Sequence, residues 1–251
     1  MNKLLESKVA LVTGAGSGIG RSISYRLADE GAAVLVSDIN DAGGAETVTH
    51  IGERGGRAIF MRSDTSKPED NDAVVKRAVE EFGALHIAVN NAGIGGPSVP
   101  VGEYPIDGWQ RVIGVNLSGV FYGMRYQIPA MLAAGGGAIV NMASVLGQVG
   151  FRNSSAYVAA KHGVVGLTQS AALEYGARKV RVNVVGPGFI KTPLLEKNMT
   201  PEAMRGLEGL HAMGRLGESD EVAELVLWLV SDKASFVTGS YYAVDGGFLA
   251  Q

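Results

Sequence analysis

Short runs of consecutive apolar residues recur along the chain, and a longer stretch with helical spacing follows nearly every one. Consecutive apolar positions suit strands covered on both faces, as in parallel sheets, because a half-exposed sheet shows alternation instead. Alternating strands and helices therefore predict an α/β fold with a doubly wound, parallel sheet. The seven expected strands are 8–12, 33–36, 58–61, 86–89, 138–140, 180–185 and 241–244.

The chain is expected to form one domain over residues 1–251, since it shows no internal repeat and no Pro/Ser-rich linker. Helical spacing is clearest where Ile19, Ile23 and Leu27 would share one face, and Ser219–Val230 is similarly amphipathic. Residues 189–214 contain prolines and several glycines around a helical core. Such a long irregular segment is expected to form a small helical lid.

Charge and composition exclude several classes of protein. The 22 basic and 25 acidic side chains give a net charge of −3, which disfavours nucleic acid as a partner. No cysteine is present, which removes disulfides and zinc sites with sulfur ligands. The N-terminus lacks the apolar core of a signal peptide, and no 18-residue apolar run follows, so we expect a cytoplasmic protein that does not enter membranes. The four histidines, which show no metal-ligand spacing, are His50, His86, His162 and His211.

A glycine-rich turn follows the first strand and precedes a helix. Its pattern is TGxxxGxG, with Gly14, Gly18 and Gly20, whereas GxGxxG and the phosphate-cradling GxxxxGK do not occur. Glycines let the backbone approach a pyrophosphate, and the free N–H groups of the helix start favour its negative charge. The context predicts a dinucleotide site, although a turn that only packs a strand against a helix is the alternative.

Asp38 stands at the end of the second expected strand. A carboxylate there can accept hydrogen bonds from an adenosine ribose and repels a 2′-phosphate by a few kcal/mol at ~4 Å separation. No lysine or arginine occurs at positions 17, 37, 39 or 40. NAD is therefore favoured over NADP, unless Asp38 is merely a turn residue.

Tyr157 and Lys161 are four residues apart, which places a phenol and an ammonium on one helical face. A tyrosine loses its proton near pH ~10, so a nearby cation would make it a usable acid or base at neutral pH. Ser144 ends an apolar run and so lies at the carboxyl edge of a central strand, where open α/β sheets bind ligands. The alternatives are a surface Tyr/Lys pair and a serine that caps the next segment.

Taken together, these motifs resemble the short-chain dehydrogenase/reductase family, in its branch of about 250 residues, over nearly the whole chain. The resemblance adds the NNAG of residues 90–93, Asp64 after the third strand and Pro187-Gly188. It implies a Rossmann fold and a catalytic tetrad of Asn116, Ser144, Tyr157 and Lys161. The implied cofactor contacts are Gly14, Ser17, Gly18, Ile19, Gly20, Asp38, Asp64, Thr65, Asn91, Ala92, Gly93, Tyr157, Lys161, Pro187, Gly188, Ile190 and Thr192.

The mechanism that the resemblance implies is hydride transfer between a nicotinamide and the carbinol carbon of a secondary alcohol, without a metal. Tyr157 would exchange the hydroxyl proton, and Lys161 would lower its pKa and bind the nicotinamide ribose. Ser144 would bond the substrate oxygen, and Asn116 would hold a water for proton release. Relatives in this family are commonly homotetramers, which we expect here too.

The residues expected near the tetrad are mostly apolar and indicate a hydrophobic or cyclic small-molecule alcohol or ketone. They are Gly95, Gly96, Val145, Leu146, Val149 and Phe151, with Leu194, Leu195, Met199, Met204, Leu207, Leu210 and Met213 from the lid. An apolar lid face that only packs is the alternative. Competing functions are a 3-oxoacyl-thioester (acyl-carrier protein) reductase and a non-catalytic NAD(H)-binding regulator.

Overall fold

A seven-stranded parallel sheet forms the centre of the protein, whose structure is a computed structural model describing residues 3–193, 195 and 200–250. The strand order is β3-β2-β1-β4-β5-β6-β9, and every neighbouring pair is parallel. The predicted fold class and all seven predicted strands are confirmed. The strands are β1 (Val9–Thr13), β2 (Ala33–Asp38), β3 (Arg57–Arg62), β4 (Ile87–Asn90), β5 (Gly137–Met142), β6 (Val180–Pro187) and β9 (Tyr241–Val244).

The sheet is covered on both faces, which explains why its strands have consecutive apolar residues. Leu11 and Val12 are neighbours on β1, yet they belong to the two separate hydrophobic cores on opposite faces. Neither side chain is exposed to solvent. Each such buried side chain contributes about 1.5–3 kcal/mol relative to exposure, so both faces stabilise the sheet.

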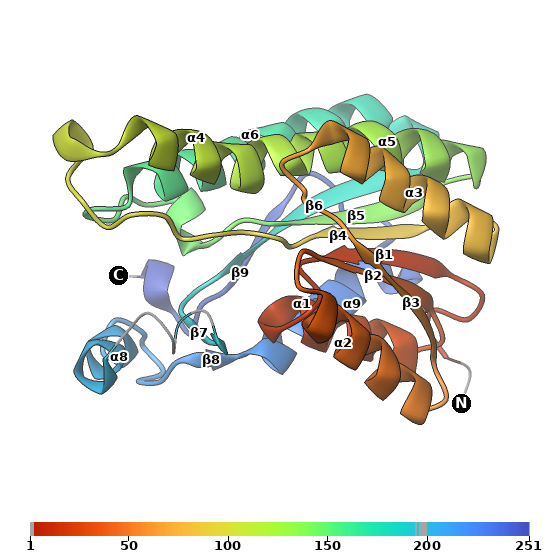
Figure 1. Ribbon diagram of the computed structural model, residues 1–251, viewed down its shortest axis with the longest axis horizontal. Helices are drawn as coiled ribbons and strands as arrows, with labels where there is room; N and C mark the ends of the chain where they lie inside the picture. Colours follow the sequence, from red (N-terminus) through yellow and green to blue (C-terminus); the bar gives the residue numbers. More distant parts are fainter. Residues whose placement is uncertain (1–2, 194, 196–199, 251) are drawn as a thin grey trace.

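Helices α3, α4, α5 and α6 lie on one side of the sheet and α1, α2 and α9 on the other (Figure 1). A π-helical turn (η2) joins α4 to α5. Short 3-10 turns are η1 (Val101–Glu103), η3 (Val145–Gly147), η4 (Gly176–Arg178), η5 (Asp232–Ala234) and η6 (Phe248–Ala250). The longer elements are α1 (Gly18–Asp29), α2 (Asp41–Glu53), α3 (Pro68–Phe82), α4 (Ile106–Ile113), η2 (Gly114–Ser118), α5 (Gly119–Ala133), α6 (Ser155–Tyr175), α8 (Pro201–Glu208) and α9 (Ser219–Val230).

Local sequence signals explain where several helices begin and end. α3 starts at Pro68, whose fixed φ and missing N–H suit the first helical turn. α9 begins at Ser219, as predicted, behind a capping box in which Glu218 N–H donates to the Glu221 carboxylate at 2.8 Å. Gly31 follows α1 with a φ of +97°, a conformation that favours glycine.

The segment 189–214 contains one element that the sequence did not reveal. Ile190–Lys191 (β7) pairs in parallel with Gly217–Glu218 (β8), and two-residue strands are too short to show any periodicity. The helical core that the sequence predicted is α8. The expected pocket residues Leu194 and Met199 lie outside the described residues.

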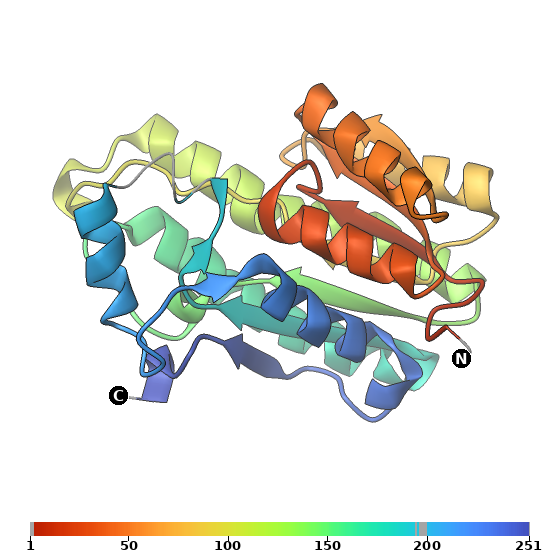
Figure 2. The same cartoon turned by 90° about the horizontal axis from the view of Figure 1, so that it is seen from below.

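Parallel strands bring their carboxyl ends to one edge of the sheet. The strand order reverses between β1 and β4, and such a switch point opens a crevice at that edge. α8 and the C-terminal turn lie at the same end of the molecule, away from the N-terminus (Figures 1 and 2). The loops that follow β1, β2, β3, β4, β5 and β6 therefore lie at the edge where this crevice opens.

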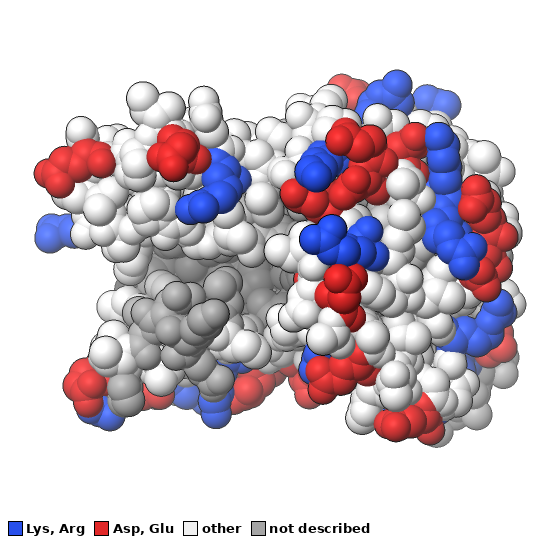
Figure 3. Space-filling view, in the orientation of Figure 1, with Lys and Arg blue, Asp and Glu red and all other residues white. Residues whose placement is uncertain are grey.

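No helix among the described residues is long and apolar enough to cross a membrane. On the face shown in Figure 3, basic and acidic side chains lie next to one another. Arg21 and Glu46 form an ion pair at 2.7 Å. The surface of that face is hollowed between the half that carries α1 and α2 and the half that carries α8 (Figure 3).

Candidate active site

The glycine turn between β1 and α1 has the geometry that only glycine accommodates well. Gly14 and Gly18 have φ values of +62° and +51°. A Cβ on Gly20 would overlap the carbonyl oxygen of Gly14, so this glycine lets the helix sit against the turn. Ser17 makes no side-chain capping hydrogen bond. The Ser17 hydroxyl therefore does not occupy the backbone N–H groups at the N-terminus of α1. These N–H groups can bind an anionic pyrophosphate.

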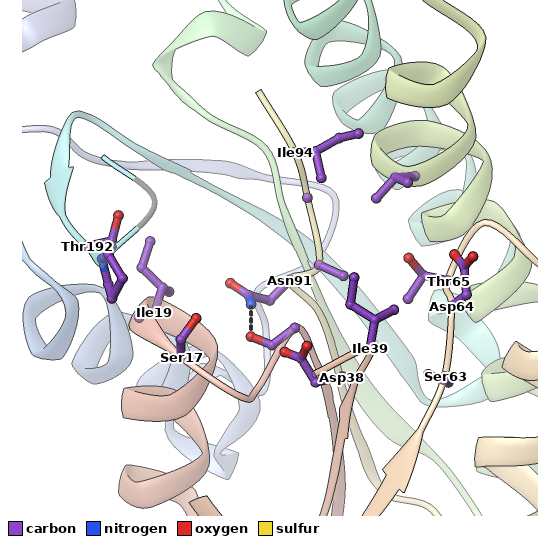
Figure 4. Close-up of a pocket in the computed structure, with 16 residues that line it drawn as sticks. Ser17, Ile19, Asp38, Ile39, Ser63, Asp64, Thr65, Asn91, Ile94 and Thr192 are labelled. Carbon is purple, nitrogen blue, oxygen red and sulfur yellow. Dashed lines mark hydrogen bonds between the residues drawn. The ribbon is translucent and has the colours of Figure 1, made fainter. Parts of the chain in front are cut away.

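Asn91, which follows β4, holds the glycine turn in place across the switch point. Its Nδ2 donates to the carbonyl oxygens of Thr13 and Gly14 at 2.9 and 3.2 Å, and Figure 4 draws one of these two bonds as a dashed line. In return, Thr13 Oγ1 accepts from the N–H groups of Asn91 and Ala92 at 3.0 and 3.1 Å. The NNAG segment and the TG pair are therefore one hydrogen-bonded unit.

Asp38 is fixed by the backbone before any ligand binds. Its Oδ2 accepts from Gly16 N–H at 2.8 Å and its Oδ1 from Asn40 N–H at 2.9 Å. Each carboxylate oxygen keeps a further lone pair for a ribose hydroxyl. A Cβ on Gly16 would lie only 2.9 Å from Oδ2, so the glycine allows this close approach.

A cavity of about 310 Å³ runs along these residues (Figure 4). It brings together side chains from the loops after β1, β2, β3 and β4, all at the carboxyl edge of the sheet. Of the expected cofactor contacts, it is lined by Gly14, Ser17, Gly18, Ile19, Asp38, Asp64, Thr65, Asn91, Ala92, Gly93 and Thr192.

A second cavity, of about 320 Å³, continues the first, because Ile19, Asn91, Gly93 and Thr192 line both. Gly20 lines neither cavity and packs behind the turn, as its contact with Gly14 explains. The other expected site residues that line this second cavity are Ser144, Tyr157, Lys161, Pro187, Gly188 and Ile190.

Ser144, Tyr157 and Lys161 lie close together in the second cavity. Ser144 Oγ accepts from Leu146 N–H at 3.2 Å and is hydrogen-bonded to the Tyr157 hydroxyl. Burial raises the pKa of Tyr157 above its usual value, and the Ser144 hydrogen bond offsets only part of the rise. Without a ligand, the tyrosine therefore carries its proton at neutral pH.

Lys161 lies beside Tyr157, and the expectation that it lowers the pKa of the phenol stays a prediction. Its Nζ lies 5.4 Å from the centre of the tyrosine ring and donates to the Met142 carbonyl at 2.7 Å. Burial lowers the pKa of Lys161 itself to about 8. Because the same burial acts on both groups, the ammonium does not outweigh the desolvation of the phenol in this arrangement.

Asn116 lies on the π-helical turn η2, fully buried. Its amide binds the main chain of Ile94 twice, since Oδ1 accepts from Ile94 N–H and Nδ2 donates to Ile94 O, both at 2.8 Å. A Cβ on Gly93 would come 3.3 Å from Asn116 Oδ1 and 3.7 Å from Lys161 Nζ. Asn116 thus joins the segment after β4 to the helix turn beside Lys161, and its amide has one N–H and one lone pair left for a water.

The outer wall of the second cavity is aromatic. Phe151 and Phe189 both line it, with ring centres 5.9 Å apart. Phe248 from the C-terminal turn and His211 from the segment after α8 stack behind Phe189, each with ring centres 5.8 Å from it. His211 also accepts from Phe189 N–H through Nε2 at 3.2 Å.

Only some of the expected substrate-pocket residues line the second cavity. Gly95, Val145, Leu146, Phe151 and Leu195 line the second cavity. Gly96 packs against Val112 and Tyr104, and Met213 lines a neighbouring cavity of about 280 Å³. The other expected residues that do not line the second cavity are Val149, Met204, Leu207 and Leu210.

Sequence reasoning missed several lining residues. Phe189 directly follows the expected Pro187-Gly188 pair, so its position could have suggested it. The apolar residues Ile39 and Val115 line the first cavity. Ile39, which follows Asp38, is 61% exposed, a high exposure for a large apolar side chain. The other missed residues of that cavity are Ser63, Ile94 and Pro193.

Among the residues that the structure describes, no group of three or more His, Asp or Glu side chains could hold a metal ion. His211, the histidine nearest to this wall, uses both ring nitrogens within the protein, because Nδ1 lies 2.8 Å from Leu207 O. The chemistry available in the cavity is thus that of a buried phenol, a hydroxyl and an ammonium.

Comparisons with known proteins agree on the type of protein. A family model described as enoyl-(acyl carrier protein) reductase matches residues 14–249. The cyclohexanol dehydrogenase of Acinetobacter sp. (strain SE19) is 53% identical over 251 residues, covering 100% of this chain and 98% of that protein. The crystal structure of levodione reductase has a TM-score of 0.96 and 36% identity, covering 98% of this chain and 99% of the other. Carveol dehydrogenase from Mycobacterium avium, solved in complex with NAD, has a TM-score of 0.94 and 31% identity, covering 99% and 100%.

Proposed function

Because the chain belongs to the short-chain dehydrogenase/reductase family, we propose that it interconverts a cyclic secondary alcohol and its ketone with NAD. The observation that carries this proposal is the meeting of Ser144, Tyr157 and Lys161 in a cavity continuous with the groove along the glycine turn. An acid–base group beside a dinucleotide groove suits hydride transfer at a carbinol carbon.

The groove fits a nicotinamide dinucleotide. The turn at Gly14 and Gly18 brings the backbone and the start of α1 to the position of a pyrophosphate, and Asp38 is placed for a ribose. When bound, the dinucleotide supplies the hydride exchange. Lys161, Pro187 and Gly188 line the second cavity, which continues the first, and there they would hold the nicotinamide half.

The reaction then depends on proton handling by this chain. In ketone reduction, the buried Tyr157 hydroxyl donates its proton to the substrate oxygen, since burial keeps it protonated. Ser144, whose Oγ accepts from Leu146 N–H and is hydrogen-bonded to the Tyr157 hydroxyl, would turn its proton to that oxygen when the substrate binds. Lys161 offers a partly charged amine, because its pKa is about 8.

The preference for NAD over NADP rests on the charges around Asp38. A 2′-phosphate would face a carboxylate that two backbone N–H groups fix in place. Arg62 lies opposite Asp38 in the sheet register, a cation that the sequence reasoning missed, but its Nε is 3.5 Å from the carboxylate of Asp41. With two acids and one base, this corner has a net negative charge and disfavours the phosphorylated cofactor.

The preference for a ring-shaped substrate rests on Phe151 and Phe189, which form an aromatic wall beside the reacting hydroxyls. A flat apolar wall offers its contact area to a ring at low entropic cost. Cyclohexanol dehydrogenase, at 53% identity, supports this choice, as does carveol dehydrogenase among the solved structures.

The test is turnover, followed by nicotinamide absorbance, with NAD or NADP and matched cyclic and open-chain secondary alcohols. We expect cyclohexanol to be oxidised with NAD at a kcat/KM at least tenfold above that with NADP. Asp38→Asn, which keeps an acceptor for Gly16 N–H, should reduce this preference, while Glu53→Gln at the exposed end of α2 should not. Preference for NADP in the unaltered protein would contradict the cofactor proposal, and equal rates for open-chain alcohols would contradict the substrate proposal.

A second candidate function is reduction of a 3-oxoacyl thioester; the description of the matched family model names a reductase of another thioester on the acyl carrier protein, the enoyl thioester. It fits less well, because Asp38 disfavours NADP and the net charge of −3 offers no overall attraction to an acidic carrier protein. A 3-oxoacyl thioester in the same panel separates the two, since a thioester reductase would prefer it to cyclohexanone.

We also propose that the chain assembles as a homotetramer. Large exposed apolar side chains support this: Phe236, before β9, is fully exposed, and Leu173 on α6 is 87% exposed. Exposed apolar surface of this kind is typical of protein interfaces where it forms a patch. Light scattering coupled to size-exclusion chromatography should give four times the 26.1 kDa chain mass, and a monomer would contradict the proposal.

A further inference from the structure

Tyr241, on the edge strand β9, reaches the turn that carries Ser144. Its hydroxyl donates to the main-chain oxygen of Ser144 at 3.0 Å, although 97 residues separate the two in the chain. Tyr241 does not line the catalytic cavity, so its contact with the site runs through the backbone of Ser144. In the sequence, Tyr241 is recognisable only as a residue of the last predicted strand.

The contact spans a whole strand, because β6 lies between β5 and β9 in the sheet. Gly186 on β6, which pairs in register with Ala243, makes the span possible. A Cβ on Gly186 would overlap the hydroxyl and Cζ of Tyr241 and would come 2.6 Å from its Cε2. Because Gly186 has no side chain, the ring of Tyr241 can lie over β6 and its hydroxyl can reach the Ser144 turn.

The turn after Ser144 is held from two sides. Ser144 O also accepts from Gly147 N–H at 2.8 Å, which closes η3. Gly147 in turn lies against α6, where an added Cβ would be 3.0 Å from the carbonyl oxygen of Lys161. The main chain of α6 therefore supports the far end of the turn, and the Tyr241 phenol supports its start at Ser144.

The phenol of Tyr241 is a permanent donor in this contact. Its burial, together with the nearby Asp245, raises its pKa to about 12. It therefore remains protonated over the whole range in which an enzyme of this type would be assayed.

We propose that Tyr241 is a positioning residue for the reaction, which sets the direction of the Ser144 hydroxyl by anchoring the Ser144 carbonyl. This inference rests on the proposed function, because it assumes that Ser144 orients the substrate oxygen. The peptide unit that Tyr241 holds sets ψ of Ser144, and with it the orientation of the Ser144 Cα–Cβ bond relative to the turn. Loss of the anchor slows proton and hydride transfer without touching the dinucleotide groove.

The test compares Tyr241→Phe, which keeps the ring that fills the space at Gly186, with Tyr242→Phe. Tyr242 is the matched control, since it is the next residue of β9 and packs on the opposite face, with its ring 6.1 Å from that of Trp228. We expect Tyr241→Phe to lower kcat for cyclohexanol about 3- to 10-fold, the value of one hydrogen bond. The Kd for NADH and the fraction of sites that bind NADH should remain unchanged, and Tyr242→Phe should match the wild type.

Two further readouts distinguish positioning from a general loss of structure. The primary deuterium isotope effect on kcat should rise in Tyr241→Phe, because the hydride step becomes more rate-limiting, whereas a partly unfolded sample would leave it unchanged. In a Ser144→Ala background, measured at high enzyme concentration, Tyr241→Phe should cause no further loss, because the hydroxyl that it positions is gone.

Unchanged kcat in Tyr241→Phe, or an equal loss with and without the Ser144 hydroxyl, would overturn the inference. Both results presuppose a wild type that turns over cyclohexanol with NAD. Failure of the proposed function would instead appear as a wild type without that activity, so the two failures are distinguishable.

Discussion

The buried charge of Lys161 makes a quantitative prediction about stability. Its pKa is lowered from 10.5 to about 8 by burial, and its side chain is 3% exposed. Between these two values the unfolded chain binds a proton that the folded chain does not, so wild-type stability rises with pH in this window. Below about pH 8, both states are protonated and the folded state carries the full penalty, about 3 kcal/mol on the scale of 1.36 kcal/mol per pH unit.

Lys161→Met removes this penalty together with its pH dependence. The hydrogen bond to Met142 O and the packing of the side chain also change, but these contributions do not vary with pH. We therefore expect the free energy of unfolding of the variant minus that of the wild type to fall by about 2 kcal/mol as the pH rises from about 7 to about 10. At neutral pH, the variant should lack dehydrogenase activity.

The assay is urea unfolding of the ligand-free wild type and variant at a series of pH values, followed by circular dichroism. Lys67→Met, at an exposed position before α3, is the matched control and should show no such trend. A stability difference that stays constant with pH, or grows with it, would refute the reasoning that Lys161 is charged and desolvated in the free protein.

Three other predictions follow from the site. Gly20→Ala should lower NADH affinity at least tenfold and reduce Tm, because the added methyl overlaps Gly14 O; NADH titration calorimetry with wild-type affinity would contradict this. Phe189→Ala should raise KM for cyclohexanol about 5- to 10-fold, the value of one aromatic contact, and should change KM for NAD little. The control Phe236→Ala, at an exposed position, should leave KM for cyclohexanol unchanged. Equal effects of the two substitutions in steady-state kinetics would argue against the aromatic wall. In the reductive direction, kcat/KM for NADH should fall above about pH 8 as Lys161 loses its charge while Tyr157 stays protonated, so a flat profile to about pH 10 would count against a charged Lys161.

Much of the fold could be predicted from the sequence because the strands are buried on both faces. β1 needs apolar side chains at consecutive positions such as Leu11 and Val12, and few structures besides a covered parallel strand need this pattern. The helix Ser219–Val230 was equally clear, since an amphipathic face and an acidic first turn agree. The β7–β8 pair was missed because two residues cannot show a period.

The order of the site residues was also predictable, since parallel strands deliver their following loops to one edge. Contacts between residues on different strands could not be predicted from the sequence. Arg62 stands opposite Asp38 only through the register of β2 and β3, and Tyr241 meets Ser144 only because Gly186 leaves room between them. The engagement of Asn116 with Ile94 likewise depends on a π-helical turn that no periodicity signals.

The most direct test of the account measures NAD-dependent oxidation of cyclohexanol and NADH binding side by side in the wild type and Tyr157→Phe. The account predicts turnover by the wild type, a loss of at least a hundredfold in Tyr157→Phe, and NADH binding by both with similar Kd. A variant that retains wild-type turnover would contradict Tyr157 as the proton donor, and NADH binding without turnover in both proteins would contradict catalysis at this site.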